Sequence, residues 1–183
     1  MCGLFGFSGD WARAEHLMPA IESAQRRGPH GTGLFYDGIE YRRLGRADPS
    51  VLACSGGSRL IIGHTRLATF GSHDDLQALQ PVVKGDLVYA HNGNVYNWKS
   101  LSEKPAPSDS FALADLLSNG RIDQTVDRIE TEAMALAVHD KRGTYLYRRR
   151  LPLHVLTAPE GTYWCSWPLD GWRSIPEDEV FCL

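Results

Sequence analysis

A cysteine occupies position 2, directly after Met1, and it is the residue of this sequence best suited to covalent chemistry. If Met1 is removed, Cys2 carries a thiol and a free α-amine on one Cα. The amine titrates close to neutral pH, so it can accept the thiol proton, directly or through a water. The thiolate could then attack an amide carbon, and the ammonium could protonate the leaving amine. The position of Cys2 alone favours a simpler interpretation, in which it is merely a small residue in a buried first strand.

Three further sites carry side chains suited to a small charged amide. Asn92 and Gly93 follow an apolar run, and a side-chain amide beside a flexible backbone N–H can converge on a developing oxyanion. Arg66 ends another apolar segment, where its guanidinium could hold a carboxylate with two hydrogen bonds. Asp109 could receive a substrate ammonium. Each has an ordinary alternative: Asn-Gly is the commonest hairpin turn, Arg66 a surface arginine, and Asp109 a helix N-cap.

The elements that must position these residues begin with a short apolar run. Residues 2–7 are followed by Ser-Gly-Asp, which predicts a buried strand and then a turn. A helix is predicted over 11–26, with Asp10 as its N-cap. A second helix is predicted up to about residue 118, capped by Ser108 or Asp109, with leucines on one face.

Strand-like runs dominate the rest of the chain. Asp37-Gly38 separates two of them and is a strong signal for a tight hairpin turn. The predicted strands cover residues 32–36, 39–44, 59–66, 81–91, 132–139, 143–148, 153–158, 161–165 and 179–182. Because few long parallel crossovers separate these runs, the pattern favours an α+β domain that contains antiparallel sheets.

The composition argues against several classes of protein. The net charge is -3, from 19 basic and 22 acidic side chains, whereas a nucleic-acid-binding face normally shows a basic excess. No apolar run approaches the ~20 residues of a membrane-spanning helix, and the N-terminus lacks the features of a signal peptide. We therefore expect a cytoplasmic protein that binds neither nucleic acid nor membrane, with residues 1–183 forming one domain.

The other three cysteines show no pattern that indicates chemistry. Cys54, Cys165 and Cys182 form no CxxC pair and have no accompanying histidine cluster, so we expect no metal site. In a cytoplasmic chain they are interpreted as small buried hydrophobic residues.

Several motifs follow one another along the chain. They are MCGLFG at 1–6, RRGPHGTG at 26–33, GHTRLATFG at 63–71, AHNGNVYN at 90–97 and SDS at 108–110. In this order they resemble the class II glutamine amidotransferase domains, which are N-terminal-nucleophile hydrolases, and the resemblance spans roughly the whole chain. It implies a four-layer αββα sandwich of two antiparallel sheets flanked by helices.

The resemblance also implies a catalytic role for three residues. Cys2 would be the nucleophile, and the Asn92 side chain and the Gly93 N–H would form the oxyanion hole. Glutamine would be hydrolysed to glutamate and ammonia through a Cys2 thioester. This half-reaction needs no metal and no organic cofactor.

Three more residues would bind the substrate. Arg66 would hold the α-carboxylate of glutamine and Asp109 its α-ammonium. Thr69, in the same loop as Arg66, would add a hydroxyl or backbone contact. A carboxylate-binding and an ammonium-binding group together would orient the side-chain amide toward Cys2.

Three positions depart from the pattern of the family. His30 stands where many members have an acidic residue, Phe111 where an acidic residue is frequent, and Phe70 where a polar residue is common. His30 could be taken for a catalytic base, but the α-amine of Cys2 already fills that role, so a structural role in the loop is preferred. None of the three positions is that of the nucleophile, an oxyanion donor or the carboxylate-binding arginine.

The sequence shows no Gly-rich phosphate loop and no nucleotide fingerprint, so it offers no ammonia-accepting site. We therefore expect a separate synthase or synthetase subunit that docks over the Cys2 pocket and receives the ammonia. Two alternatives stay open. The nucleophile could cleave another amide, or the chain could be a catalytically silent, regulatory subunit that binds glutamine. The opposite charges of Arg66 and Asp109 favour a free amino acid over other amides.

Overall fold

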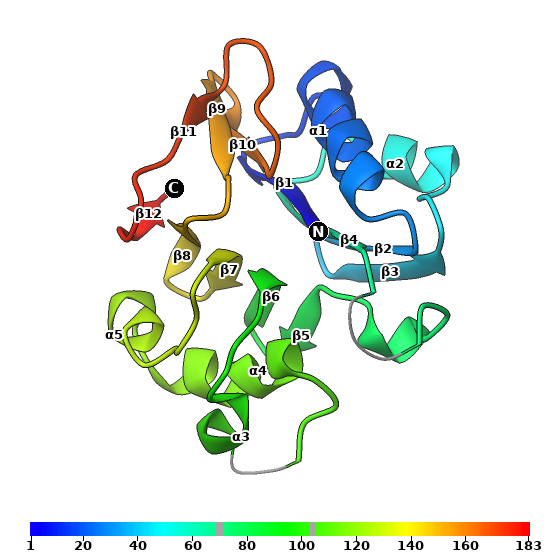
Figure 1. The fold of residues 1–183 in the computed structure, drawn as a ribbon. Helices are drawn as coiled ribbons and strands as arrows, with labels where there is room; N and C mark the ends of the chain where they lie inside the picture. Colours follow the sequence, from blue (N-terminus) through cyan, green and yellow to red (C-terminus); the bar gives the residue numbers. More distant parts are fainter. Residues whose placement is uncertain (69–71, 103–104) are drawn as a thin grey trace.

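Two antiparallel sheets lie face to face at the centre of the protein, and helices cover the outer face of each (Figure 1). The computed structural model describes residues 1–68, 72–102 and 105–183, without the side chain of Cys54. This is the expected four-layer αββα sandwich, and the α+β prediction is confirmed.

The first sheet contains, in the described residues, seven strands in the order β11-β9-β10-β1-β4-β2-β3. Helices α1 (Ala14–Arg27) and α2 (Pro49–Ser55) pack against its outer face. The strands are β1 (Gly3–Gly9), β2 (Gly31–Tyr36), β3 (Ile39–Leu44), β4 (Leu60–Arg66), β9 (His154–Ala158), β10 (Gly161–Cys165) and β11 (Arg173–Ser174).

The second sheet contains, over the same described ranges, five strands in the order β12-β8-β7-β6-β5. They are β5 (Val82–Lys84), β6 (Leu87–Gly93), β7 (Met134–Asp140), β8 (Gly143–Arg149) and β12 (Phe181–Cys182). Helix α4 (Asp109–Asn119) packs on β5 and β6, and the short helices α3 (Trp98–Leu101) and α5 (Ile122–Val126) contact α4. The short helix η1 (Leu76–Ala78) contacts β3 at the edge of the first sheet.

Side-chain alternation along the central strands explains the layers. In β1, Leu4 points between the two sheets, whereas Phe5 and Phe7 point toward α1 and α2. In β6, Ala90 points between the sheets and Tyr89 points toward α4. Because successive side chains of a strand face opposite sides, a strand that is apolar on both faces must lie between two covering layers.

Most of the expected elements are present. Asp37 and Gly38 form the expected hairpin turn with positive φ angles of 44° and 93°. Pro19 lies inside α1, which continues through it. The run 81–91 is not one strand but two, β5 and β6, because the chain turns at Gly85 with φ 59° and pairs Val82 with Tyr89.

One predicted helix cap differs from the structure, and another lies at the predicted position without the expected side-chain bond. Asp10 is not an N-cap: its N–H donates to the carbonyl of Glu160, so the chain stays extended and Arg13 precedes α1. Ser108 is the N-cap residue of α4, as one of the two predicted alternatives had it, but its side chain makes no capping hydrogen bond. Asp109 is the first residue of the helix. Patterns near a helix start therefore predict the helix more reliably than its exact first residue, because helix ends vary by one or two residues with the local hydrogen bonds.

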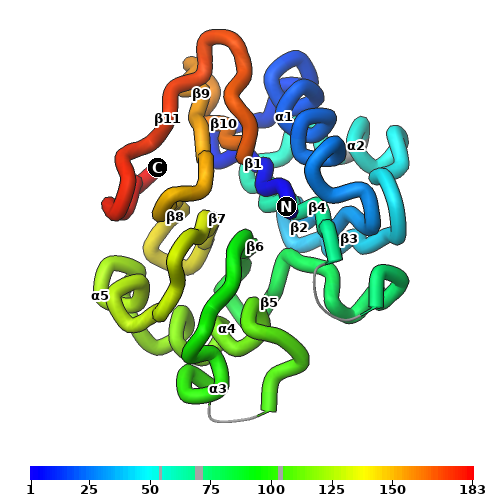
Figure 2. The backbone as a smooth tube through the Cα atoms, in the orientation of Figure 1, coloured from blue at the N-terminus to red at the C-terminus, as the bar shows by residue number. Residues whose placement is uncertain are grey.

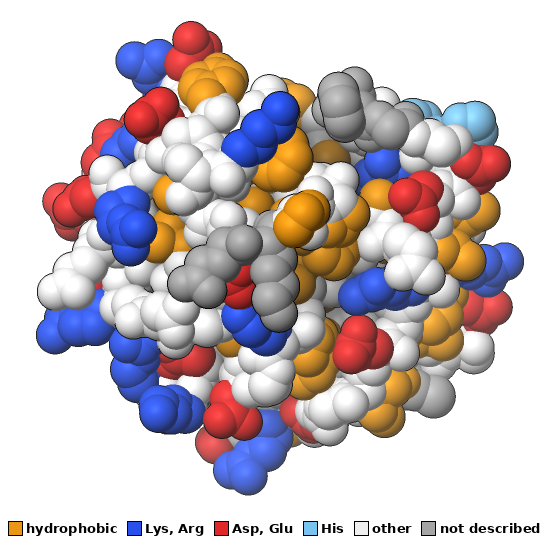
Figure 3. All heavy atoms as spheres, turned by 90° about the horizontal axis from the view of Figure 1, so that it is seen from below, with side chains coloured by type: hydrophobic (Ala, Val, Ile, Leu, Met, Phe, Trp, Pro, Cys, Tyr) orange, Lys and Arg blue, Asp and Glu red, His pale blue; other side chains and the backbone are white. Residues whose placement is uncertain are grey.

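The cysteine prediction is correct for one residue and wrong for another. Cys165 is fully buried in β10, whereas Cys182 is exposed because it lies in β12, at the edge of the second sheet. Among the described residues, no helix is long and apolar enough to cross a membrane. On the face seen from below, acidic and basic side chains are interspersed around hydrophobic ones (Figure 3).

Candidate active site

The candidate residues lie where strands end or a helix begins: Cys2 before β1, Arg66 at the end of β4, Asn92 and Gly93 at the end of β6, and Asp109 at the start of α4. Strands β1 and β4 are antiparallel neighbours, so the start of one lies beside the end of the other (Figure 2). The end of β6 approaches the same place from the opposite sheet. Two sheets therefore contribute to one site.

The backbone and the thiol of Cys2 are both held by hydrogen bonds. Its carbonyl accepts from Arg27 Nε at 3.0 Å and from Asn92 Nδ2 at 2.9 Å. Its Sγ accepts from the backbone N–H of Leu67 at 3.4 Å. The position of the thiol is thus set by α1, by the segment after β4 and by β6.

Burial dominates the electrostatics of the thiol. It raises the pKa of Cys2 above its ordinary value, because a thiolate loses hydration in this half-buried place. The Leu67 N–H and the positive charges of the N-terminus, Arg66 and Arg27 oppose the shift without cancelling it. The thiol form is therefore favoured while Met1 is attached, and a nearby base is needed to produce the nucleophile.

Arg66 is buried, with 8% of its surface exposed, and is not an ordinary surface arginine. Its Nη1 donates to the carbonyl of Ser72 at 2.6 Å. Its own carbonyl accepts from the N–H of His30 at 3.0 Å, and His30 Nδ1 accepts from the N–H of Ala68 at 2.9 Å. His30 therefore braces the backbone on both sides of Leu67, which agrees with a structural role in the loop.

Asn92 and Gly93 do not form a hairpin turn. They are the last two residues of β6, and Gly93 pairs with Met134 of β7. Gly93 has φ 127°, and a Cβ at this position would lie 2.4 Å from the carbonyl oxygen of Ala133. Only glycine fits there, so the backbone beside the Asn92 side chain has a conformation closed to other residues.

The carboxylate of Asp109 ties α4 to the segment after β6. It accepts from the backbone N–H of Val95 at 3.0 Å and from that of Ser110 at 2.7 Å. Its charge also acts on buried His91, whose pKa is lowered by burial and raised less strongly by Asp109. Asp109 therefore lies next to the strand end that carries Asn92.

The structure thus joins Cys2 directly to Asn92 and places Arg66 beside them, while Asp109 is linked through the segment after Gly93. Thr69 and Phe70 lie outside the described residues. Arg27 and Leu67 were not singled out from the sequence as site residues. The RRGPHGTG and GHTRLATFG motifs contain them and were the available signal. Across the described ranges, no three His, Cys, Asp or Glu side chains gather as metal ligands.

A four-layer αββα sandwich with a cysteine at the start of a central strand has the fold of an N-terminal-nucleophile hydrolase. Glutamine phosphoribosylpyrophosphate amidotransferase from B. subtilis superposes with a TM-score of 0.74 at 21% identity, over 95% of this chain and 44% of that one. A predicted glutamine amidotransferase from Pseudomonas aeruginosa PA01 gives 0.56 at 18% identity, over 98% and 91%. At such identities the likeness concerns the fold alone.

Sequence comparison identifies the family within this fold. The chain is 30% identical over 181 residues to glutamine–fructose-6-phosphate aminotransferase of Thermotoga maritima, covering 88% of this chain and 29% of the relative. It is 32% identical over 115 residues to chloroplastic amidophosphoribosyltransferase of Vigna aconitifolia, covering 56% and 23%. No family model matches. The chain belongs to the class II glutamine amidotransferase domains. It spans less than a third of the length of the curated relatives it matches.

Proposed function

We propose that this chain hydrolyses the side-chain amide of glutamine to glutamate and ammonia, with Cys2 as nucleophile after removal of Met1. The bond of 2.9 Å from Asn92 Nδ2 to the carbonyl of Cys2 carries the proposal, because it places a side-chain amide donor beside the reacting residue. Met1 is 61% exposed, so its removal disturbs little packing.

The α-amine released on Cys2 supplies the missing base. It takes the thiol proton, and the thiolate forms a bond to the amide carbon of glutamine. The resulting oxyanion accepts hydrogen bonds from Asn92 Nδ2 and the Gly93 N–H. The carbon–nitrogen bond then breaks, the ammonium returns its proton to the leaving group, and ammonia departs. Water hydrolyses the thioester to glutamate and regenerates the thiol.

Arg66 and Asp109 recognise the two charges of the free amino acid in this proposal. The contact of Arg66 with Ser72 uses one Nη1 hydrogen, and a guanidinium carries five N–H donors in a fixed plane. Each oxygen of Asp109 accepts a backbone N–H, and a carboxylate has about four acceptor positions for further bonds. Thr69, three residues after Arg66 in the sequence, is proposed as a third substrate-binding residue.

We further propose that the ammonia passes to an acceptor site on a separate protein that covers the Cys2 pocket. The motif pattern supports this, because residues 1–183 show no Gly-rich phosphate loop and no nucleotide fingerprint that could form an acceptor site. The glutaminase step itself requires no metal and no organic cofactor. Amination of a defined acceptor by the isolated chain unaided would contradict the separate-protein proposal.

The test is glutamate release from glutamine by the purified chain, with the intact mass recorded to establish whether Met1 is absent. Cys2→Ala should abolish release. Cys182→Ala is the matched control, because it removes an exposed thiol in β12 and should leave release unchanged. A chain that lacks Met1 and hydrolyses other amides but not glutamine would contradict the proposed substrate. Full activity in Cys2→Ala would contradict the proposed nucleophile.

A further inference from the structure

A buried side chain that the proposed reaction does not use lies behind the site. Gln80 is 5% exposed and precedes β5. Its Oε1 accepts from the backbone N–H of His91 at 2.7 Å. Its Nε2 donates to the carbonyl of His91 at 3.0 Å and to the hydroxyl of Ser110 at 3.1 Å. One amide therefore binds both backbone groups of one residue of β6 and a side chain of α4.

The partners of Gln80 are direct neighbours of site residues. His91 precedes Asn92, and Ser110 follows Asp109. Both partners are buried, and His91 Nδ1 also lies 3.2 Å from the Ser110 hydroxyl, which closes the network. The end of β6 and the start of α4 are consequently held at one separation through Gln80.

A third element, β4, reaches the same amide. His64 Nε2 lies 3.5 Å from Gln80 Nε2, and His64 is two residues before Arg66 on β4. Burial lowers the pKa of His64 to about 3, so the ring that lies against the amide is neutral at physiological pH. The groups that Gln80 itself bonds are uncharged, so its contacts depend on the geometry of its hydrogen bonds.

A motif glycine makes room for this arrangement. A Cβ at Gly33 would lie 1.7 Å from the carbonyl oxygen of Gln80. Gly33 ends the RRGPHGTG motif and pairs with His64 in the first sheet. The segment that carries Gln80 therefore packs directly on the backbone of β2, which explains why the motif needs a glycine there.

We propose that Gln80 is a positioning residue for the glutaminase reaction. By holding His91 and Ser110 it sets the separation between the oxyanion donors, Asn92 and Gly93, and the ammonium-binding Asp109. This inference rests on the proposed function of the site. A substrate whose α-ammonium binds Asp109 presents its amide to Cys2 only if that separation is correct.

Kinetics of Gln80→Leu and Gln80→Glu test the proposal. Gln80→Leu removes every bond of the amide, and we expect kcat to fall roughly 10- to 100-fold, because misplacement of about 1 Å is sufficient for such a loss. Gln80→Glu keeps an acceptor for the His91 N–H but loses the Nε2 donor, so its kcat should lie between those of wild type and Gln80→Leu. Gly33→Ala should resemble Gln80→Leu, because its Cβ displaces the same segment.

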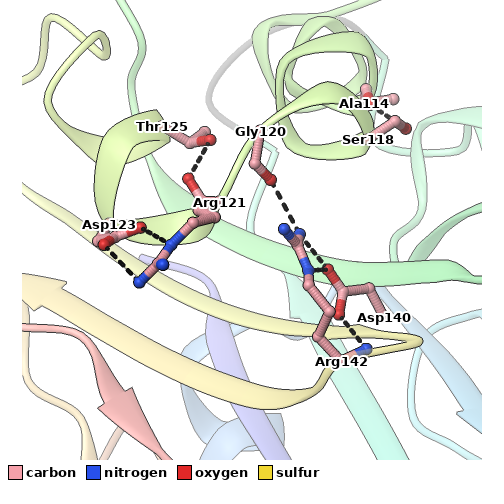
Figure 4. Close-up of polar contacts among 8 residues, drawn as sticks. All are labelled: Ala114, Ser118, Gly120, Arg121, Asp123, Thr125, Asp140 and Arg142. Atoms are coloured by element: carbon pink, nitrogen blue, oxygen red, sulfur yellow. Dashed lines mark hydrogen bonds and ion pairs between the residues drawn. The ribbon is translucent and has the colours of Figure 1, made fainter.

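Thr125→Val is the control for a substitution that lowers stability but leaves the site residues in place. Thr125 is buried in α5, and its hydroxyl donates to the carbonyl of Arg121 at 2.8 Å (Figure 4). The substitution removes a hydrogen bond of similar kind within the helix itself. We expect it to lower the melting temperature and to leave kcat and KM unchanged.

A second measurement does not depend on activity. In nuclear magnetic resonance spectra, Gln80→Leu should move the Gly93 N–H and Asn92 side-chain resonances and reduce the protection of the His91 N–H from exchange, whereas Thr125→Val should not. An inactive wild-type chain would count against the proposed function, and these spectra would still decide the role of Gln80. The inference would be overturned if these resonances stayed in place in Gln80→Leu. It would also be overturned if the kcat of Gln80→Leu were within twofold of that of Thr125→Val.

Discussion

Asn92 and Cys2 are 90 positions apart in the sequence, and the side-chain amide of Asn92 donates to the backbone carbonyl of Cys2 at 2.9 Å. Asn92 belongs to β6 of the second sheet, and Cys2 precedes β1 of the first. The bond therefore crosses the sandwich, and the geometry of the site depends on how the two sheets are stacked.

Removal of the Asn92 amide should affect the chemical step more than substrate binding. We expect Asn92→Ala to lower kcat about 100- to 1000-fold with a small change in KM, which is the usual cost of losing one oxyanion donor. Steady-state glutaminase kinetics measure this. Asn97→Ala is the matched control, because the Asn97 side chain donates to the Arg128 carbonyl on the surface. A large rise in KM at constant kcat would assign Asn92 to binding instead.

Substitution of Arg66 should act on substrate binding. We expect Arg66→Lys to raise KM roughly 10- to 100-fold, because an ammonium cannot replace a bidentate guanidinium and a hydrogen bond to a charged group contributes about 1.5–3 kcal/mol. Arg59→Lys, at an exposed position before the same strand, should leave KM unchanged. Equal KM values for the wild type and Arg66→Lys would show that another residue binds the carboxylate.

A side chain at Gly93 should destabilise the protein. Gly93→Ala combines a strained φ of 127° with a contact of 2.4 Å to Ala133, so we expect a loss of about 2–5 kcal/mol in the free energy of unfolding. Gly45→Ala separates the two effects, because Gly45 has φ 77° and open space around it, and it should cost about 1–2 kcal/mol. Denaturant unfolding measures both. Equal losses in Gly93→Ala and Gly45→Ala would mean that the end of β6 moves away from the new Cβ at no cost in stability.

Stability should fall in acid because of a buried histidine. Burial lowers the pKa of His64 from 6.5 to about 3, so the unfolded chain binds a proton in this range that the folded chain does not. The free energy of unfolding should therefore decrease as the pH falls from 6.5 toward 3. The slope should be shallower in His64→Gln by up to about 1.4 kcal/mol per pH unit.

The control for this pH dependence is His73→Gln, at an exposed position. Urea unfolding at several pH values should give the same slope for His73→Gln as for the wild type. If His64→Gln also keeps the slope of the wild type, His64 is not the group responsible.

Local patterns in the sequence determined much of this protein. The hairpin at Asp37 and Gly38 was predictable because the turn type depends on the conformation of those two residues alone. The α+β class follows from short apolar runs separated by turn signals. The ordered motifs indicated the family and named the candidate residues.

The tertiary structure decided which of these residues meet. It showed that Asn92 and Gly93 end a strand and form no turn, that Arg66 is buried, and that Gln80 joins β6 to α4. No local pattern contains these facts. A strand end acquires its neighbours only when β1 pairs with β4 and the two sheets stack, and those contacts join residues far apart in the chain.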